Sequence, residues 1–313
     1  MLKGLAMTPP VIGRISIGRV VERNGKRLPE KDDEFTLTSQ VQGLDGWVRH
    51  PLDAALRQDG AKLRSIPVRL VFGAPELNLR ASFTLFDRST GRPWCVGDGE
   101  RCKRVTEQGI ESLPCPTPAA CPLGQEGRCK PYGRLHVRVM APEVEAGAGA
   151  GAGEDDGLGT FVFRTTGFNS IRTLAARLAY FKAVSGGMLA SLPLTLRLRG
   201  KSTTMSHRTP IYYVDLTTPA GMSLEQAIVQ AGEEDERRKQ LGFDQWALDE
   251  AAREGYAAGA FEESEEEGAA VVEEFYPDAD GQETQADEAS RATLEAKLER
   301  RLRRQGERVT GDP

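Results

Sequence analysis

Residues 95–129 read CVGDGERCKRVTEQGIESLPCPTPAACPLGQEGRC, and all five cysteines of the 313-residue chain lie in this stretch. The residues between the cysteines are rich in Gly, Pro, Asp and Glu rather than in apolar side chains. A segment with so little to bury cannot offset its loss of conformational entropy through the hydrophobic effect alone. Tetrahedral Zn²⁺ held by four thiolates is the usual way to stabilise such a segment in a reduced intracellular protein. The stretch therefore predicts a structural zinc lobe.

Four zinc ligands have to be chosen from the five cysteines. Cys115, Cys121 and Cys129 share one Pro- and Gly-rich lobe, so the fourth ligand is either Cys95 or Cys102. We favour Cys95, because it stands at a predicted strand end beside a Gly-Asp-Gly turn, and Cys102 is the second choice. A closed site of four thiolates leaves no open coordination position, so the metal would be structural. The spacing is not the paired CxxC pattern, and buried or reactive thiols with one disulfide are the alternative.

Alternating apolar and polar residues flank the cysteine stretch on both sides and predict β-strands. We expect strands at residues 11–21, 34–39, 66–72, 77–87, 135–140, 160–165, 194–201 and 211–216. The zinc lobe is then an insertion between two strands of one sheet. The predicted fold class is α+β, with a mainly antiparallel β-sheet core, for which an OB-like arrangement is one form.

One amphipathic helix should pack on this sheet. It is expected to begin at Asn169 or Ser170 and to end at Gly186. Its apolar face, spaced at three and four residues, consists of Ile171, Leu174, Leu178 and Phe181.

The composition divides the chain into successive parts. We predict a β-rich core at 1–218 with the zinc lobe at 95–130 and a flexible Gly/Ala loop at 145–159, a helical extension at 219–260, a disordered acidic tail at 261–290 and a basic amphipathic helix at 291–313. The helical extension begins with a capping box, Ser223 to Gln226.

The formal net charge of −5 conceals a strong asymmetry. Residues 1–230 carry 30 Lys and Arg against 22 Asp and Glu, whereas residues 261–290 carry 12 acids and no base. A basic body followed by an acidic tail suits a protein that meets nucleic acid. Ordinary surface charge with a solubilising tail explains the same numbers equally well.

Basic side chains gather on the predicted helix and on the strands that follow it. Those that we expect to contact DNA phosphates are Arg172, Arg177, Arg197, Arg199, Lys201 and Arg208. Such contacts give non-specific, salt-dependent binding, and the nearby Tyr212 and Tyr213 could stack on unpaired bases. The alternative is a solvated outer face of an antiparallel sheet.

Several function classes find no support. The chain has no P-loop, HExxH or GxSxG motif in a fitting context, so we expect no catalysis. It has no apolar run long enough to span a membrane and no signal peptide, which predicts a cytoplasmic protein without a membrane partner.

Three stretches together resemble a known family: RISIGRVVERNGKRLPEKDDEFTLTS, the CVGDGE…LPCP…C…CKPYGRL block and GTFVFRTTGFNSIRTLAARLAYF. The chain is similar over residues 1–220 to the recombination directionality factor-like proteins of phages and integrative elements. The resemblance implies an accessory protein that binds a serine integrase on DNA and switches it from integration to excision. It also implies that Cys102 is the dispensable cysteine, in agreement with the choice of Cys95.

Two other functions stay open. A single-stranded DNA-binding or annealing protein would also use a basic sheet with a zinc lobe. A metal-dependent hydrolase is the weaker alternative, because relatives often carry the label of hydrolase or metal-binding protein.

Overall fold

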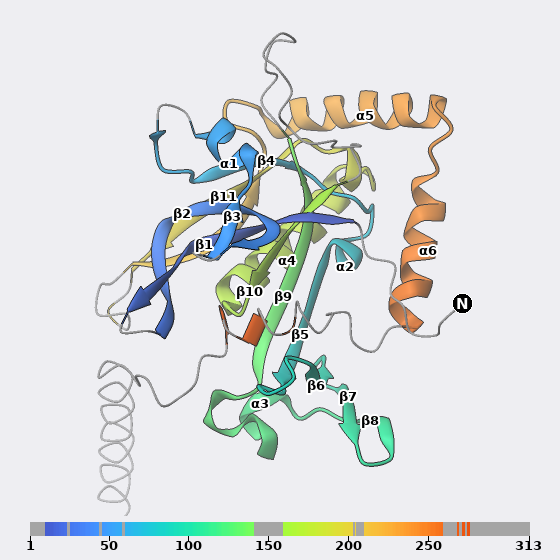
Figure 1. Ribbon diagram of the computed structural model, residues 1–313. Helices are drawn as coiled ribbons and strands as arrows, with labels where there is room; N and C mark the ends of the chain where they lie inside the picture. Colours follow the sequence, from blue (N-terminus) through green and yellow to red (C-terminus); the bar gives the residue numbers. More distant parts are fainter. Residues whose placement is uncertain are drawn as a thin grey trace, which may run out of the picture. The chain divides into compact units, whose positions relative to one another are not determined.

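Figure 1 shows the computed structural model, which describes residues 10–23, 26–43, 46–57, 60–140, 159–202, 204, 210–258, 268, 271–272 and 274–275. The chain divides into two compact units, Met1–Phe275 and Tyr276–Pro313, and every described residue belongs to the first unit.

Twelve strands form the body of the part of this unit that the structure describes. They are β1 (Val11–Arg23), β2 (Lys26–Gly43), β3 (Gly46–Arg49), β4 (Ser65–Arg69), β5 (Leu79–Phe86), β6 (Pro93–Gly97), β7 (Arg101–Thr106), β8 (Gly109–Pro114), β9 (Lys130–Val139), β10 (Thr160–Thr165), β11 (Leu194–Lys201) and β12 (Ile211–Thr217). The helices are α1 (Pro51–Leu56), α2 (Pro75–Asn78), α3 (Thr117–Ala120), α4 (Phe168–Val184), α5 (Leu224–Gln240) and α6 (Gln245–Ala258).

The strands form one large, branched sheet. Hydrogen-bonded neighbours follow the order β3-β2-β1-β10-β9-β5-β6-β7-β8, and β4 joins the end of β9 to β11, which in turn pairs with β12. The strand pairs are antiparallel except for β1 and β10, which run parallel. The prediction of an α+β fold with a mainly antiparallel sheet is therefore confirmed.

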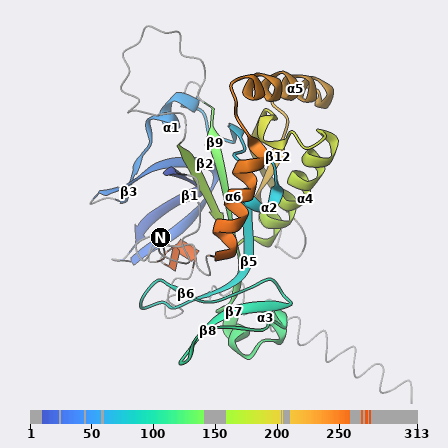
Figure 2. The ribbon, with the colours of Figure 1, turned by 90° about the vertical axis from the view of Figure 1, so that its right-hand side faces the viewer.

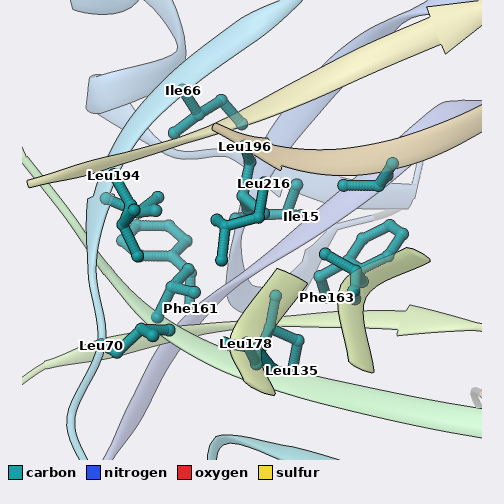
Figure 3. Close-up of a cluster of buried hydrophobic side chains, with 14 of the residues drawn as sticks. Ile15, Ile66, Leu70, Leu135, Phe161, Phe163, Leu178, Leu194, Leu196 and Leu216 are labelled. Carbon is teal, nitrogen blue, oxygen red and sulfur yellow. The ribbon is translucent and has the colours of Figure 1, made fainter. Parts of the chain in front are cut away.

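The main core lies where the two branches of the sheet face each other. Figure 3 shows Ile66, Leu194, Leu196 and Leu216 from β4, β11 and β12 beside Phe161 and Phe163 of β10, with Ile15, Leu70, Leu135 and Leu178 in the same cluster. All ten side chains are buried. The apolar residues at alternate positions of β4 and β11 are buried, as the pattern predicts for strands that bury one face, whereas β10 is buried at every position.

Helix α4 completes this core. The predicted face of Ile171, Leu174, Leu178 and Phe181 is buried, and the helix contacts β12. The predicted cap is wrong, however, since Gly167 is the N-cap residue and makes no side-chain cap bond. Ser170 instead accepts a hydrogen bond from the backbone N–H of Val214 at 3.1 Å, so its hydroxyl covers the outer edge of β12.

The cysteine stretch contains more regular structure than its composition predicts. Its first half forms β6, β7 and β8, which Figures 1 and 2 show beyond the ends of β5 and β9. Because β5 pairs with β9, the stretch is an insertion between two strands of one sheet, as expected. Cys95 lies in the middle of β6 rather than at a strand end.

The C-terminal part differs from the predicted tail. Residues 268, 271–272 and 274–275 are helical, Val271 is 2% exposed, and the ring of Phe275 packs edge-on against Tyr132. At these described positions the acidic stretch contains helical residues, with Val271 buried and Phe275 partly exposed. The Gly/Ala loop, apart from Gly159, and the predicted basic helix at 291–313 lie outside the described residues. None of the helices in the described ranges is long and apolar enough to cross a membrane.

Candidate nucleic-acid interface and thiol cluster

The predicted basic surface is built by α4 and by the outward face of β11 and β12. Residues 159–217 carry eight Lys and Arg but a single acid, Asp215. In the β11–β12 register Arg197 is opposite Asp215, Arg199 is opposite Tyr213, and Lys201 is opposite Ile211. Directly opposed residues share a face of the sheet, so these basic side chains point away from Leu196 and the core.

Asp215 organises the centre of this surface. Its carboxylate, in a residue only 2% exposed, accepts hydrogen bonds from Arg177 Nε at 2.9 Å and from Arg199 Nε at 2.6 Å. Burial by itself would raise the pKa of Asp215, but the two guanidinium groups hold it below its ordinary value of 3.8. Two cations thus share one anion, and the side chains of Arg177 and Arg199 remain 44% and 41% exposed.

Lys201 lies at the other end of the same face. Its ammonium group donates to Asn169 Oδ1 at 2.8 Å and stands 5.7 Å from the ring centre of Tyr213. Asn169 belongs to α4, so Lys201 links the helix to the sheet, as the ion pair between Arg177 and Asp215 does. Charges that are held in this way present a fixed array to an anionic ligand, which lowers the entropy cost of binding.

The structure brings together four of the six predicted DNA-contacting residues: Arg177, Arg197, Arg199 and Lys201. Arg172 is exposed but lies about 140° around α4 from Arg177, since each residue turns a helix by about 100°. Arg208 lies outside the described residues. Sequence reasoning missed Asp215, although the lone acid opposite Arg197 in the expected hairpin was a signal for it.

The five cysteines form a second cluster, around β6, β7 and β8. Cys95 is opposite Arg104, and Gly97 is opposite Cys102, so both thiols are on one face of β6 and β7. Cys95 and Cys102 pack with Leu85, and Cys115 and Cys129 lie against the same small cluster. All five thiols are free, and no disulfide joins them.

Gly97 allows the thiols to pack closely, because it has no side chain. A Cβ atom at this position would stand 2.8 Å from Cys115 Sγ and 2.9 Å from Cys102 Cβ. Cys115 is held there by a hydrogen bond from its backbone N–H to the carbonyl oxygen of Glu100 at 2.9 Å. Cys121 ends α3, and its N–H donates to the carbonyl oxygen of Thr117 at 3.0 Å.

The thiols perturb one another's protonation. Burial, together with the proximity of the other four thiols, raises the pKa of Cys129 to about 12. Burial and a hydrogen bond with Cys95 raise the pKa of Cys102 to about 11, while the guanidinium of Arg104, whose Nη2 is 3.9 Å from Cys102 Sγ, acts in the opposite direction. Cys102 and Cys129 are therefore thiols at neutral pH, and a divalent cation would favour their thiolate form.

The residues fit zinc by donor type, since soft thiolates in a group of four are the usual structural zinc ligands. The clearance above Gly97 fits as well. As the side chains stand, however, no group of three or more His, Cys, Asp or Glu within the described ranges could hold a metal ion. The structure therefore shows converging thiols, and the zinc lobe itself stays a prediction.

Comparison with known proteins bears on both clusters. The family model Gp3-like, described as recombination directionality factor-like, matches residues 12–219, which include the basic surface and the thiol cluster. No curated protein and no solved structure gives a significant match. Since the match spans about two thirds of the 313 residues and includes nearly all of the described strands, the chain belongs to the recombination directionality factor-like family.

Proposed function

We propose that this protein is an accessory DNA-recombination factor that binds a serine integrase on DNA and favours excision, without making or breaking bonds itself. Family membership supports a role in recombination. The observation that carries the DNA contact is the acid-poor surface in which Asp215 orients Arg177 and Arg199 beside Arg197 and Lys201. A role as a single-stranded DNA-binding protein on an OB-like sheet is the second interpretation of the sequence, and the family membership does not favour it.

DNA binding is tested by changing Arg197, Arg199 and Lys201 together to Ala. We expect weaker binding to duplex DNA of any sequence, and a salt slope smaller by about one for each phosphate that the variant no longer neutralises. The measurement is fluorescence anisotropy over a salt series.

The matched control changes Arg237, Lys239 and Arg253 of α5 and α6 to Ala, which removes the same charge from another surface. Equal reductions of affinity in the two triple variants would mean that net charge, and not this surface, attracts DNA.

The role in recombination is tested by adding the protein to its cognate serine integrase, which should shift recombination from integration to excision.

We also propose that Cys95, Cys115, Cys121 and Cys129 hold one structural zinc ion. The support is the convergence of the thiols and the clearance at Gly97. Metal analysis of protein purified under reducing conditions should find about one zinc per chain. Substitution by Ser should remove the zinc and destabilise the lobe at each of the four proposed ligands, Cys95, Cys115, Cys121 and Cys129. Cys102→Ser should have a smaller effect on zinc content and stability.

A further variant tests the packing of the cluster without removing a ligand. Gly97→Ala should lower zinc content, because its methyl group would overlap Cys115 Sγ. The control is Gly232→Ala in α5, where an added Cβ meets no atom within 4 Å. Protein that lacks zinc, or that keeps it in all four Cys variants, would contradict the proposed site.

A further inference from the structure

The face of β6, β7 and β8 opposite the thiols presents a row of apolar side chains. Val105 of β7 is directly opposite Ile110 of β8. Trp94 of β6 precedes the Cys95–Arg104 pair, and its indole N–H donates to the carbonyl oxygen of Val105 at 2.9 Å. The three side chains therefore stand side by side across three strands.

This row is exposed, although each member is large and apolar. Trp94 is 42% exposed, Val105 is 38% exposed and Ile110 is 53% exposed. Burial alternates along the same strands, with Cys95 and Cys102 inward. Because the only polar atom of the Trp94 side chain is already bonded within the hairpin, the indole offers apolar surface to a ligand.

Within these three described strands, the same face carries positive charge and no negative charge. Arg101 and Lys103 are exposed on it, at alternate positions with Val105. The guanidinium of Arg101 contacts Ser112 Oγ at 3.1 Å, and Lys103 is opposite Ser112. By the alternation of the strands, Glu111 falls on the thiol face, opposite Arg104.

We propose that this face is a docking surface for a partner protein, and that its occupant is an amphipathic helix with a short apolar strip flanked by acidic side chains. Neighbouring strands are about 4.8 Å apart, so the row is about 10 Å long. Helix residues i and i+7 are about 10.5 Å apart, so two turns of an apolar strip cover the row. Arg101 and Lys103 then face the acids of the partner.

Protein fits this face better than nucleic acid does. Val105 and Ile110 have side chains with no hydrogen-bonding group for a base edge or a phosphate. An apolar row with a Trp and a flanking Arg is typical of protein interfaces. The assignment rests on the proposed function for the identity of the partner, which is the serine integrase. The basic surface around Asp215 remains available to DNA, because it is formed by other elements.

The test is photo-crosslinking with the full chain and its cognate integrase. A benzophenone amino acid replaces Ile110 in one protein and Val41 of β2, which is 63% exposed, in the other. We expect integrase to be captured from position 110 and not from position 41. In parallel, Val105→Ser with Ile110→Ser should weaken integrase binding at least tenfold, and Val41→Ser with Val48→Ser should leave it unchanged.

Lys103→Glu should weaken integrase binding with an effect that fades at high salt, because the expected partner groups are acidic. Unchanged thermal unfolding of the variants shows that the β7–β8 hairpin is intact. The crosslink from position 110 is a second test, which does not depend on a destabilising substitution. Integrase that binds the wild type but is neither captured from position 110 nor affected by the variants overturns the docking surface and leaves the proposed function standing. Integrase that binds no form of the protein overturns both. Capture of DNA or of a second copy of this chain from position 110 overturns the assignment to a partner helix.

Discussion

At the scale of single residues, Asp215 shows how one acid can serve a basic surface. Without it, Arg177 and Arg199 would repel each other on facing elements and would sample many rotamers. With it, both guanidinium groups are fixed by short, charge-assisted hydrogen bonds and keep a large exposed fraction. The acid lowers the net charge of the surface by one but orders two of its cations.

We expect Asp215→Asn to lower the stability of the protein and to change how that stability depends on pH. Loss of the ionised acceptor should lower the free energy of unfolding by about 2 kcal/mol at neutral pH. Because the folded pKa of Asp215 lies below 3.8, its stabilisation is present above that value and is lost as the pH falls through the folded pKa.

Urea unfolding from pH 6 downwards measures this difference. The wild type and the variant should converge at the acid end of the series. A constant difference at all pH values would contradict the role of the ionised carboxylate. DNA affinity of the variant tests the ordering of Arg177 and Arg199 separately.

At the scale of elements, α4 joins the packing of the core to the basic surface. Its buried face fixes its rotation, and Ser170 fixes its distance from β12 by accepting the N–H of Val214. Asn169 and Arg177, on the same side of the helix, then reach Lys201 and Asp215. The hydrogen bond of Ser170 therefore affects both stability and the site.

Ser170→Ala should lower the free energy of unfolding by about 1–3 kcal/mol, because it leaves the buried N–H of Val214 without its acceptor. Hydrogen exchange of the Val214 amide should become faster. Ser223→Ala is a useful comparison, since it removes the exposed cap of α5 and should cost about 1 kcal/mol without affecting that amide. Equal protection of Val214 in wild type and S170A would show that β12 does not depend on this bond.

At the scale of the whole molecule, the first compact unit extends to Phe275, beyond the point where the composition becomes acidic. Val271 is buried, Phe275 packs against Tyr132, and Lys130 donates to the carbonyl oxygen of Phe275 at 3.1 Å. These contacts attach the start of the acidic stretch to β9, next to the thiol cluster.

Protein that ends at Ala260 should therefore be less stable than protein that ends at Phe275. Burial of one Val and one Phe contributes about 1.5–3 kcal/mol each, and because Phe275 is partly exposed, the expected difference is about 3 kcal/mol. Thermal and urea unfolding of the two truncated proteins measure it. Identical midpoints would mean that residues 261–275 do not stabilise the first unit.

The sequence by itself determined the features that depend on local periodicity and on short-range hydrogen bonds. The buried face of α4, the two-faced strand β11, the capping box at Ser223 and the insertion of the cysteine stretch follow from such patterns. They are readable because a helix or strand repeats its orientation every few residues. The family resemblance likewise needed no coordinates.

Only the tertiary structure decided which distant segments meet. The parallel pairing of β1 with β10 joins residues near 13 to residues near 161, and no local pattern encodes such a contact. The strands β6, β7 and β8 have few apolar residues, so the composition concealed them, and their register alone separates a thiol face from the face of Trp94, Val105 and Ile110. The roles of Ser170 and Asp215 depend on partners about 40 residues away in the chain. Long-range packing chooses among the many partners that each side chain could have, and a single sequence carries no periodic signal for that choice.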